Sequence, residues 1–394
     1  MTPFPRDDYR SLTRYEPDRE PVEIDLSDNT NLWGTHPGAL ARIRAAGTDD
    51  LARYPELYAD VLRDAVAERF GVPAACVTTG AGSDDVLDSA FRAAAAPGAV
   101  VAYASPTFSM VEPLARMNGM DARAVPWADA LTDPGALLAE EPALVYVCRP
   151  NNPTGEVAPR AWFEALLELA GRSSAAVTTS VSSPTSSPAP LVILDEAYAD
   201  FAEDTWITRG AEVPGLLVAR TSSKAYGLAG LRCGFGVATP ETALEIEKSR
   251  GPYKVARLTA EAVAAAVRDA EGWMAGLVAE VRTNRARLHD ALVARGLDPI
   301  PSQANFILCR APTGKSAADV RALRSHGIGV RPFTGIAGMG EGLRVTVGPW
   351  PLMERFLDAL DAVLAASPGA ADTREPADAP AASDNPDRST TPSS

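Results

Sequence analysis

The chain has 394 residues, of which 46% are hydrophobic and 22% charged, values that suit a globular protein of two or three domains. Its formal net charge of −14 argues against nucleic acids and anionic membranes as partners. The four cysteines are widely spaced without a CxxC pair, and there are only three histidines, so we expect neither a disulfide scaffold nor a metal site. We find no signal peptide and no apolar run of membrane-spanning length, and therefore expect a cytoplasmic protein.

The first half of the chain alternates between helical and strand-like patterns. Apolar residues recur at helical spacing over Tyr58–Phe70, Asp84–Ala96 and, further on, Arg160–Ala170. Short apolar runs bounded by turn residues suit strands that are buried on both faces of a parallel sheet. This alternation predicts an α/β domain with a mostly parallel central sheet flanked by helices. The runs are Ala99–Tyr103, Leu144–Cys148, Leu191–Leu194, Leu216–Ala219 and Gly234–Ala238.

Beyond Glu241 the pattern changes to long helices and then to mixed elements, which predicts a smaller C-terminal α+β domain. We therefore expect an N-terminal arm over 1–46 that packs on the small domain, a large domain over 47–250, and a small domain over 251–367. The helices are expected over Glu241–Arg250, Ala256–Val267, Met274–Arg295, Ala317–His326 and Leu352–Ala365, and the strands over Asn305–Cys309 and Leu343–Val347.

Two segments are rich in Ser, Thr, Pro and Ala and have no periodic apolar face. Because such segments bury too little surface to offset their ordering entropy, we expect a mobile surface insertion over 172–190 and a disordered tail over 368–394.

Lys224 follows a predicted strand and precedes a turn of small residues over 225–230. A lysine in so apolar a segment, near Arg232, is desolvated beside another cation, which lowers its pKa and makes the amine nucleophilic. Such an amine can hold an aldehyde as a Schiff base. The competing interpretation is an ordinary solvated lysine, which the apolar neighbours disfavour.

Polar residues also follow the other predicted strands. Asp195 comes directly after Leu191–Leu194, at the carboxyl end of the sheet, where open α/β folds bind ligands. A buried carboxylate there needs a partner such as a protonated ring nitrogen, although an aspartate that caps the next helix would fit the pattern as well. Tyr198 lies three residues on, and Asn152 lies in a turn that follows Leu144–Cys148.

The turn at 80–84 precedes the predicted helix Asp84–Ala96 and contains two glycines. Free N–H groups and the helix dipole make such a turn a cradle for an anion. Asp85 stands where a dinucleotide fingerprint would have its third glycine, so a single phosphate fits better than a dinucleotide.

Four motifs occur in order at these strand ends: PNNPTG at 150–155, DEAY at 195–198, SSKAYGLAGLRCGFG at 222–236 and LRVTVG at 343–348. Together they resemble the fold-type I aminotransferases that depend on pyridoxal phosphate, and within them the histidinol-phosphate aminotransferase branch. The resemblance extends from about residue 25 to residue 365. It implies the α/β fold described above, a homodimer, and transfer of an amino group between histidinol phosphate or a related amino acid and a 2-oxo acid such as 2-oxoglutarate.

The resemblance also implies roles for individual residues. Lys224 matches the lysine that forms the Schiff base and moves protons, and Asp195 matches the partner of the ring nitrogen. Asn152 and Tyr198 match the pair that binds the ring hydroxyl, and Phe108 matches the aromatic residue stacked on the ring, an interpretation that we favour over a simple core residue.

The remaining matches concern the phosphate and the substrate. Tyr54 matches a tyrosine that reaches the cofactor phosphate of the neighbouring subunit, and Arg344 matches an arginine that binds the carboxyl or phosphate group of the substrate. The phosphate would further be held by Ala81, Gly82, Ser83, Asp84, Thr221, Ser223 and Arg232. Asn29, Trp33 and Arg331 are expected near the substrate, with Arg331 equally well explained as structural.

The chain departs from the family pattern at Thr30, where glutamate is usual, at Val111, where tyrosine is usual, and at Arg149, where a small residue is usual. These differences lie on the substrate side, so the amino donor stays open. A decarboxylase, oxidase or cyclase acting on an amino acid could use the same scaffold. A cofactor-sensing module of a transcription regulator is disfavoured by the acidic charge and by the position of the matching region close to residue 1.

Overall fold

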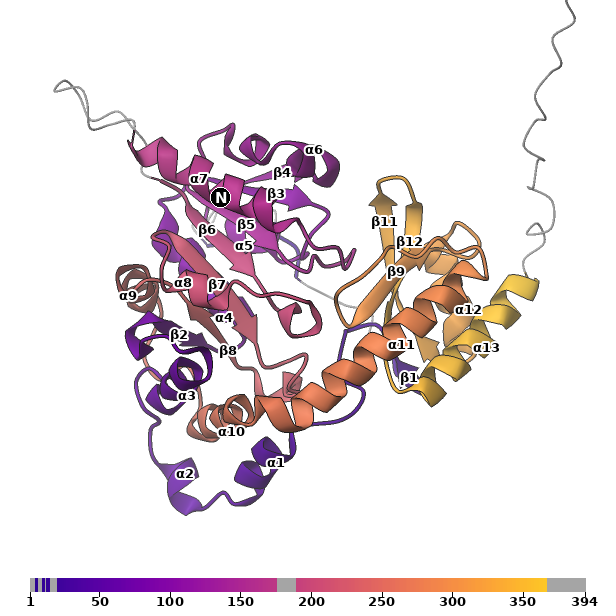
Figure 1. The fold of residues 1–394 in the computed structure, drawn as a ribbon, viewed down its shortest axis with the longest axis horizontal. Coiled ribbons are helices and arrows are strands. Elements are labelled where there is room, and N and C mark those ends of the chain that lie inside the picture. The colour runs from indigo at the N-terminus through magenta and orange to yellow at the C-terminus, as the bar shows by residue number, and fades with distance from the viewer. Residues whose placement is uncertain (1–3, 6–8, 11, 15–19, 176–188, 367–394) are drawn as a thin grey trace, which may run out of the picture.

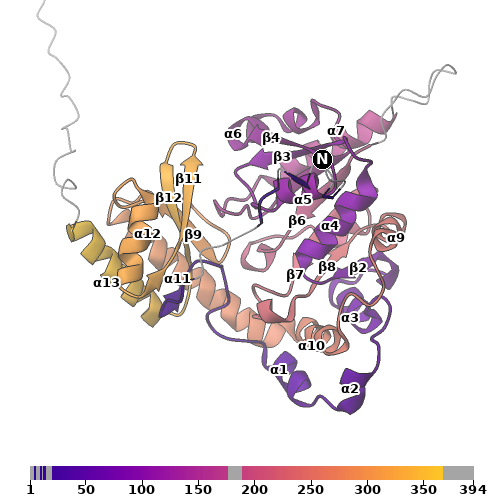
Figure 2. The same ribbon diagram turned by 180° about the vertical axis from the view of Figure 1, so that it is seen from behind.

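The computed structural model describes residues 4–5, 9–10, 12–14, 20–175 and 189–366. The disordered tail expected over 368–394 lies outside the described residues, as does most of the insertion expected over 172–190. Figures 1 and 2 show two bodies side by side, one built on a large sheet and the other on a small sheet with helices against it. None of the helices in the described ranges is both long and apolar enough to cross a membrane.

The large body is built on a seven-stranded sheet with the strand order β2-β8-β7-β6-β5-β3-β4. Five neighbouring strands, from β7 to β4, are parallel, and β8 is antiparallel to both of its neighbours. The mostly parallel sheet expected from the apolar runs is therefore confirmed. The strands are β2 (Val77–Gly80), β3 (Val100–Ser105), β4 (Asp121–Pro126), β5 (Leu144–Cys148), β6 (Leu191–Asp195), β7 (Leu216–Thr221) and β8 (Gly234–Val237).

Helices cover both faces of this sheet, because alternate side chains of each buried strand enter different cores. On β5, Tyr146 and Cys148 belong to the core beneath α4, α5 and α9, whereas Val145 and Val147 belong to the core shared with α3 and α7. The flanking helices are α3 (Asp60–Phe70), α4 (Ser83–Ala94), α5 (Val111–Met117), α6 (Trp127–Thr132), α7 (Arg160–Ala175), α8 (Ile207–Gly210), α9 (Pro240–Ser249) and α10 (Arg257–Arg268).

The small body contains an antiparallel sheet of β9 (Phe306–Arg310), β12 (Gly340–Thr346) and β11 (Arg331–Ile336), with β12 in the centre. Helices α12 (Ser316–Ser325) and α13 (Trp350–Ala366) complete it, and the long α11 (Ala275–Val293) runs between the two bodies (Figure 1).

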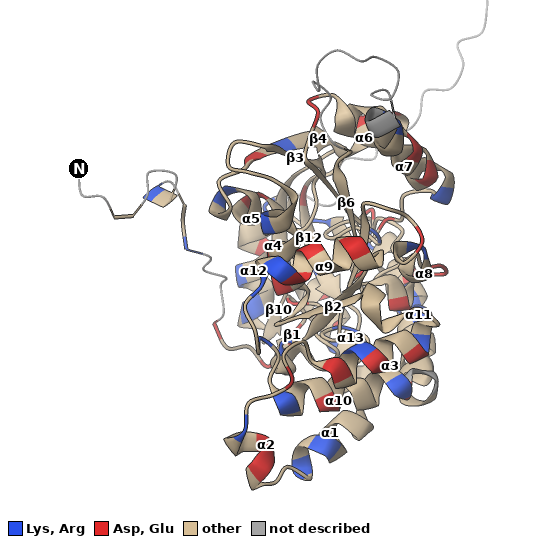
Figure 3. Ribbon diagram, turned by 90° about the vertical axis from the view of Figure 1, so that its left-hand side faces the viewer, with Lys and Arg blue, Asp and Glu red and all other residues tan. Residues whose placement is uncertain are grey.

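An N-terminal arm joins the two bodies. Its short strand β1 (Ile24–Asp25) pairs in parallel with β10 (Ile328–Gly329) of the small body. After the arm, α1 (Pro37–Arg44) packs against α10 of the large body, and α2 (Thr48–Ala52) follows. In the view of Figure 3, acidic and basic residues are interspersed along helices such as α3 and α10.

Candidate functional site

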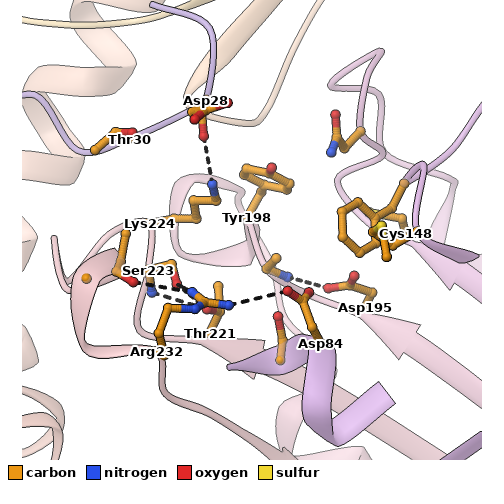
Figure 4. Close-up of a pocket in the computed structure, with 17 residues that line it drawn as sticks. Asp28, Thr30, Asp84, Cys148, Asp195, Tyr198, Thr221, Ser223, Lys224 and Arg232 are labelled. Carbon is orange, nitrogen blue, oxygen red and sulfur yellow. Dashed lines mark hydrogen bonds and ion pairs between the residues drawn. The ribbon is translucent and has the colours of Figure 1, made fainter. Parts of the chain in front are cut away.

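A cavity of about 650 Å³ opens at the carboxyl ends of β5, β6 and β7, where the large sheet faces the arm (Figure 4). Its volume is in the range of small-molecule and cofactor sites. A second cavity of about 250 Å³ adjoins it towards the small body and shares Asp28, Phe108, Asn152, Tyr198 and Lys224 with it. The two cavities lie where the arm near Asp28, the ends of the large-sheet strands and the small sheet near Arg344 meet.

Lys224 lies in the turn after β7, and its side chain enters the cavity beneath the arm (Figure 4). Its Nζ donates a hydrogen bond to the backbone carbonyl of Asp28 at 3.0 Å. Burial, reinforced by the positive charge of Arg344, lowers the pKa of the amine from 10.5 to about 8. Lys224 therefore exchanges its proton near neutral pH, which is the property of an amine that acts as nucleophile or base.

Asp195 is the last residue of β6 and lines the same cavity. One carboxylate oxygen, Oδ2, accepts a hydrogen bond from the hydroxyl of Tyr146 at 2.6 Å, and the other, Oδ1, accepts one from the backbone N–H of Ala197 at 2.9 Å. Burial raises the pKa of this carboxyl group from 3.8 to about 6, and the two donors partly oppose the rise. At neutral pH the site thus holds a buried negative charge that suits a cationic N–H group.

The loop from β2 to α4, formed by Ala81 and Gly82, lies beside the cavity and close to Arg232. Gly82 has a φ of +93°, and a Cβ added there would lie 2.7 Å from Nη2 of Arg232, so only glycine lets the loop approach the guanidinium. Arg232 pairs with Asp84 at 3.3 Å and donates to Oγ of Ser223 at 3.5 Å, which in turn accepts from Thr221 at 2.9 Å.

Both backbone N–H groups of this loop already donate hydrogen bonds to the adjoining strand or helix. The N–H of Ala81 donates to the carboxylate of Asp85 at 3.0 Å, and the N–H of Gly82 donates to the carbonyl of Gly80 at 2.9 Å. Helix α4 has no side-chain cap, and Ser83 and Asp84 of its first turn line the cavity. A helix N-terminus of this kind favours an anion.

Arg344 reaches the site from β12 of the small body and is buried. One nitrogen, Nη1, donates to the amide oxygen of Asn152, and Nη2 donates to the carbonyl of Ser27 at 2.6 Å. On the arm, Nδ2 of Asn29 donates to the hydroxyl of Tyr198 at 3.0 Å. The large sheet, the small sheet and the arm are thus linked by hydrogen bonds around the two cavities.

Most of the residues selected from the sequence lie together. Those that line the larger cavity are Ser83, Asp84, Phe108, Asn152, Asp195, Tyr198, Thr221, Ser223, Lys224 and Arg232, and those that line the smaller one include Asn29, Arg331 and Arg344.

The structure places the other selected residues elsewhere. Ala81 and Gly82 lie in the loop beside the cavity rather than in its lining, and Trp33 is half-buried against the core and lines neither cavity. Tyr54 is 80% exposed, and its ring lies against that of Tyr253 with centroids 5.0 Å apart. The expected roles of these four residues stay predictions.

Sequence reasoning missed Asp28, whose carbonyl binds Lys224, and Tyr146, which binds Asp195. The contact of Asp28 could not be predicted from the sequence, because every residue type has a backbone carbonyl. Tyr146 did leave a signal: a tyrosine within the buried strand Leu144–Cys148 must find a partner for its hydroxyl.

The chain is similar to known proteins in both sequence and structure. The family model for aminotransferases of class I and II matches residues 21–360. An aromatic amino acid aminotransferase of Streptomyces coelicolor is 35% identical over 372 residues, which cover 90% of this chain and 96% of the relative. A histidinol-phosphate aminotransferase of a Nostoc species is 32% identical over 365 residues, which cover 91% and 98%. Among solved structures, the histidinol-phosphate aminotransferase of Sinorhizobium meliloti in complex with pyridoxal-5'-phosphate aligns with a TM-score of 0.75 at 27% identity, covering 92% of this chain and 97% of that one.

Proposed function

The chain belongs to the aminotransferases of class I and II and is a pyridoxal-phosphate-dependent enzyme, and we propose that Lys224, Asp195 and the loop beside Arg232 hold its cofactor. One observation carries this proposal. An amine with a lowered pKa and a carboxyl group with a raised pKa line one cavity, which also contains an arginine beside an uncapped helix N-terminus.

The residues of the cavity fit the chemistry of the cofactor. Arg232, the hydroxyls of Thr221 and Ser223, and the first turn of α4 match a phosphate, and the approach of Gly82 to Arg232 leaves no room there for a side chain. Asp195 suits a protonated ring nitrogen. The remaining contacts would come from Asn152 and Tyr198 at the ring hydroxyl and from Phe108 at the ring face, all of which line the cavity.

When bound, pyridoxal phosphate supplies an aldehyde and an electron-withdrawing ring. Lys224 would hold that aldehyde until the amino group of the substrate replaces it. The freed amine, whose pKa burial lowers to about 8, would then take a proton from the α-carbon of the substrate and later return it. Burial raises the pKa of Tyr198, so its hydroxyl stays protonated and serves as a hydrogen-bond donor. Asp195 holds its negative charge above pH 6, and Arg344 orients an anionic group of the substrate.

The amino donor that we propose is histidinol phosphate or a related amino acid, including aromatic or specialised ones, with a 2-oxo acid such as 2-oxoglutarate as acceptor. Two arginines, Arg331 and Arg344, line the smaller cavity together with the rings of Phe108 and Phe333. A guanidinium binds a carboxylate or a phosphate equally well, so this lining supports both kinds of donor named among the relatives.

We also propose that the active unit is a homodimer in which Tyr54 reaches the cofactor phosphate of the other subunit. Tyr54 is exposed, yet its segment is held: Arg257 donates to its carbonyl at 2.7 Å. Leu51 and Leu57 beside it are 74% and 46% exposed, so a second copy of the chain would cover an apolar patch. Mixing inactive Tyr54→Ala and Lys224→Ala proteins tests this: restored activity in the mixture is expected, and its absence at every ratio would contradict shared sites.

The division into an arm over 1–46, a large domain over 47–250 and a small domain over 251–367 is likewise a proposal. The pairing of β1 with β10 and the separate sheets of the two bodies support it. Helices α1 and α10 pack on each other beside the large sheet, so 37–44 and 257–268 lie with the large body rather than with the arm and the small domain. The cytoplasmic location expected from the sequence stays a prediction.

The proposed cofactor residues are tested by the absorbance of the purified protein with pyridoxal phosphate. We expect a visible band that Lys224→Ala loses and that the matched variant Lys248→Ala keeps, because Lys248 is exposed on α9. Histidinol phosphate or an aromatic amino acid should bleach the band, and 2-oxoglutarate should restore it. A band that Lys224→Ala retains unchanged would contradict the assignment of Lys224. Consumption of the donor without 2-oxo acid dependence would favour a lyase or an oxidase.

A further inference from the structure

Tyr146 is a polar group within the sheet that supports the cavity. It is fully buried on β5, in a strand whose other residues are apolar, and does not line either cavity. Its hydroxyl donates to Oδ2 of Asp195 at 2.6 Å, a length typical of a hydrogen bond to a charged acceptor. Tyr146 therefore acts on the contents of the cavity only through Asp195.

The sheet fixes this contact. Cys148 of β5 pairs in register with Asp195 of β6, and Tyr146 lies two residues before Cys148 on the same face. The backbone N–H of Ala197 binds the other carboxylate oxygen, so donors from two elements hold the two oxygens and fix the plane of the carboxyl group. Each oxygen keeps further acceptor capacity for a donor in the cavity.

The direction of the hydrogen bond is fixed as well. Burial, together with the charge of Asp195, raises the pKa of Tyr146 well above its ordinary value, so the phenol keeps its proton and donates. The same bond works against the desolvation of Asp195, because a donor stabilises the ionised carboxylate more than the neutral acid. Without it, the carboxyl group would become more basic.

We propose that Tyr146 is a positioning residue of the transamination reaction, which holds Asp195 ionised and correctly oriented so that the shared proton stays on the ring nitrogen of the cofactor. The proposal rests on the assignment of Asp195 to that nitrogen under the proposed function. No proton leaves Tyr146. Its hydrogen bond to Asp195 disfavours transfer of the proton on the ring nitrogen to either carboxylate oxygen of Asp195. Transamination depends on that proton, because it makes the ring an electron sink.

The test is Tyr146→Phe in the full chain loaded with pyridoxal phosphate that carries ¹⁵N in the ring. In the unaltered protein we expect the ¹⁵N chemical shift of a protonated ring nitrogen. In Tyr146→Phe we expect it to move towards the neutral value, with kcat lowered about tenfold, as suits the loss of one hydrogen bond to a charged group, and with KM little changed. A change in packing alone would not move this shift.

Tyr103→Phe is the matched control. Tyr103 lies beside Tyr146 in register on β3, is buried in the same core, and does not line either cavity, so its substitution should leave the shift and kcat unaltered. A second variant carries 3-fluorotyrosine at position 146, whose more acidic phenol is a stronger donor. It should keep the ring nitrogen protonated to higher pH, and it provides the test even where Tyr146→Phe folds poorly.

Asp195→Asn distinguishes a failure of the proposed role of Tyr146 from a failure of the assignment of Asp195 to the ring nitrogen. If Asp195→Asn moves the ¹⁵N shift and neither substitution at position 146 does, the role of Tyr146 is refuted while the proposed function stands. If Asp195→Asn also leaves the shift unaltered, Asp195 is not the partner of the ring nitrogen, and the assignment on which the proposal rests is wrong.

Discussion

Asp195 is a functional group that the folded chain holds at a cost in stability, and Asp195→Asn should reveal that cost. The amide has nearly the shape of the carboxyl group, and both contacts can persist: Oδ1 still accepts from the N–H of Ala197, and the new amide donates to the hydroxyl oxygen of Tyr146. The substitution therefore removes a buried charge without leaving a cavity. We expect the cofactor-free variant to be more stable than the unaltered protein at neutral pH.

The magnitude follows from the pKa of Asp195, which is 3.8 in the reference state and about 6 in the folded chain. Because the folded state binds its proton more tightly, stability falls as pH rises between these two values and is constant above them. At about 1.4 kcal/mol per pH unit, the charge costs about 1 kcal/mol at pH 4.5 and about 3 kcal/mol at pH 8. Asp195→Asn should recover these amounts.

The assay is denaturant unfolding of the cofactor-free protein at fixed protomer concentration, with the two proteins compared from pH 4.5 to pH 8. The difference in the free energy of unfolding should grow by about 2 kcal/mol across this window, chiefly below pH 6. A difference that is independent of pH would mean that Asp195 titrates like an exposed carboxyl group, and would refute the reasoning from burial. Pyridoxal phosphate should stabilise Asp195→Asn less than the unaltered protein.

Three further outcomes are expected. Labelling of cofactor-free protein with trinitrobenzenesulfonate should show one lysine amine that, like an α-amino group, reacts with a midpoint near pH 8 and that disappears in Lys224→Ala, because burial lowers the pKa of that lysine; a midpoint near 10 for every lysine would contradict this. Gly82→Ala should weaken binding of pyridoxal phosphate about tenfold or more while leaving phosphate-free pyridoxal unaffected, because its Cβ would meet Arg232 at a φ of +93°; equal losses for both would point to a general defect. Arg149 is buried and binds Asp204 through two nitrogens at 2.8 and 3.3 Å, so Arg149→Ala should lower the free energy of unfolding by about 3 kcal/mol, and a double-mutant cycle with Asp204→Ala should show coupling rather than additivity.

Local apolar patterning made the buried elements predictable. The strand expected over Leu144–Cys148 has the same bounds in the structure, and Leu191–Leu194 differs from β6 by one residue. In contrast, β4 (Asp121–Pro126) lies at the edge of the sheet with mostly exposed or half-exposed side chains, so no apolar run marked it. The antiparallel orientation of β8 and the two-residue pairing of β1 with β10 are long-range contacts, which local periodicity does not encode.

In the candidate site, too, local patterning predicts some residues, whereas other contacts depend on the assembled fold. Lys224 and Asp195 were found because they follow apolar strands, where parallel sheets place their ligands. The contact of Tyr146 with Asp195 depends on the register of two strands, and the contact of Asp28 with Lys224 depends on an arm that returns across the molecule. Each of these requires the assembled fold. Trp33, expected near the substrate, is partly buried against the core, and its role at the substrate stays a prediction.

The arm also restricts how the two bodies can move. The N–H of Asn29 is bonded to Thr346 of the small sheet, and only two residues later Asn31 donates to the carbonyl of Lys224 on the large one. Two residues of chain span at most about 7 Å, so the two attachment points stay close as long as both hydrogen bonds hold. The arm thus holds the two bodies together at this point. If the small body rotates on the large one, this point would move least, and the cavities would widen on the side away from it.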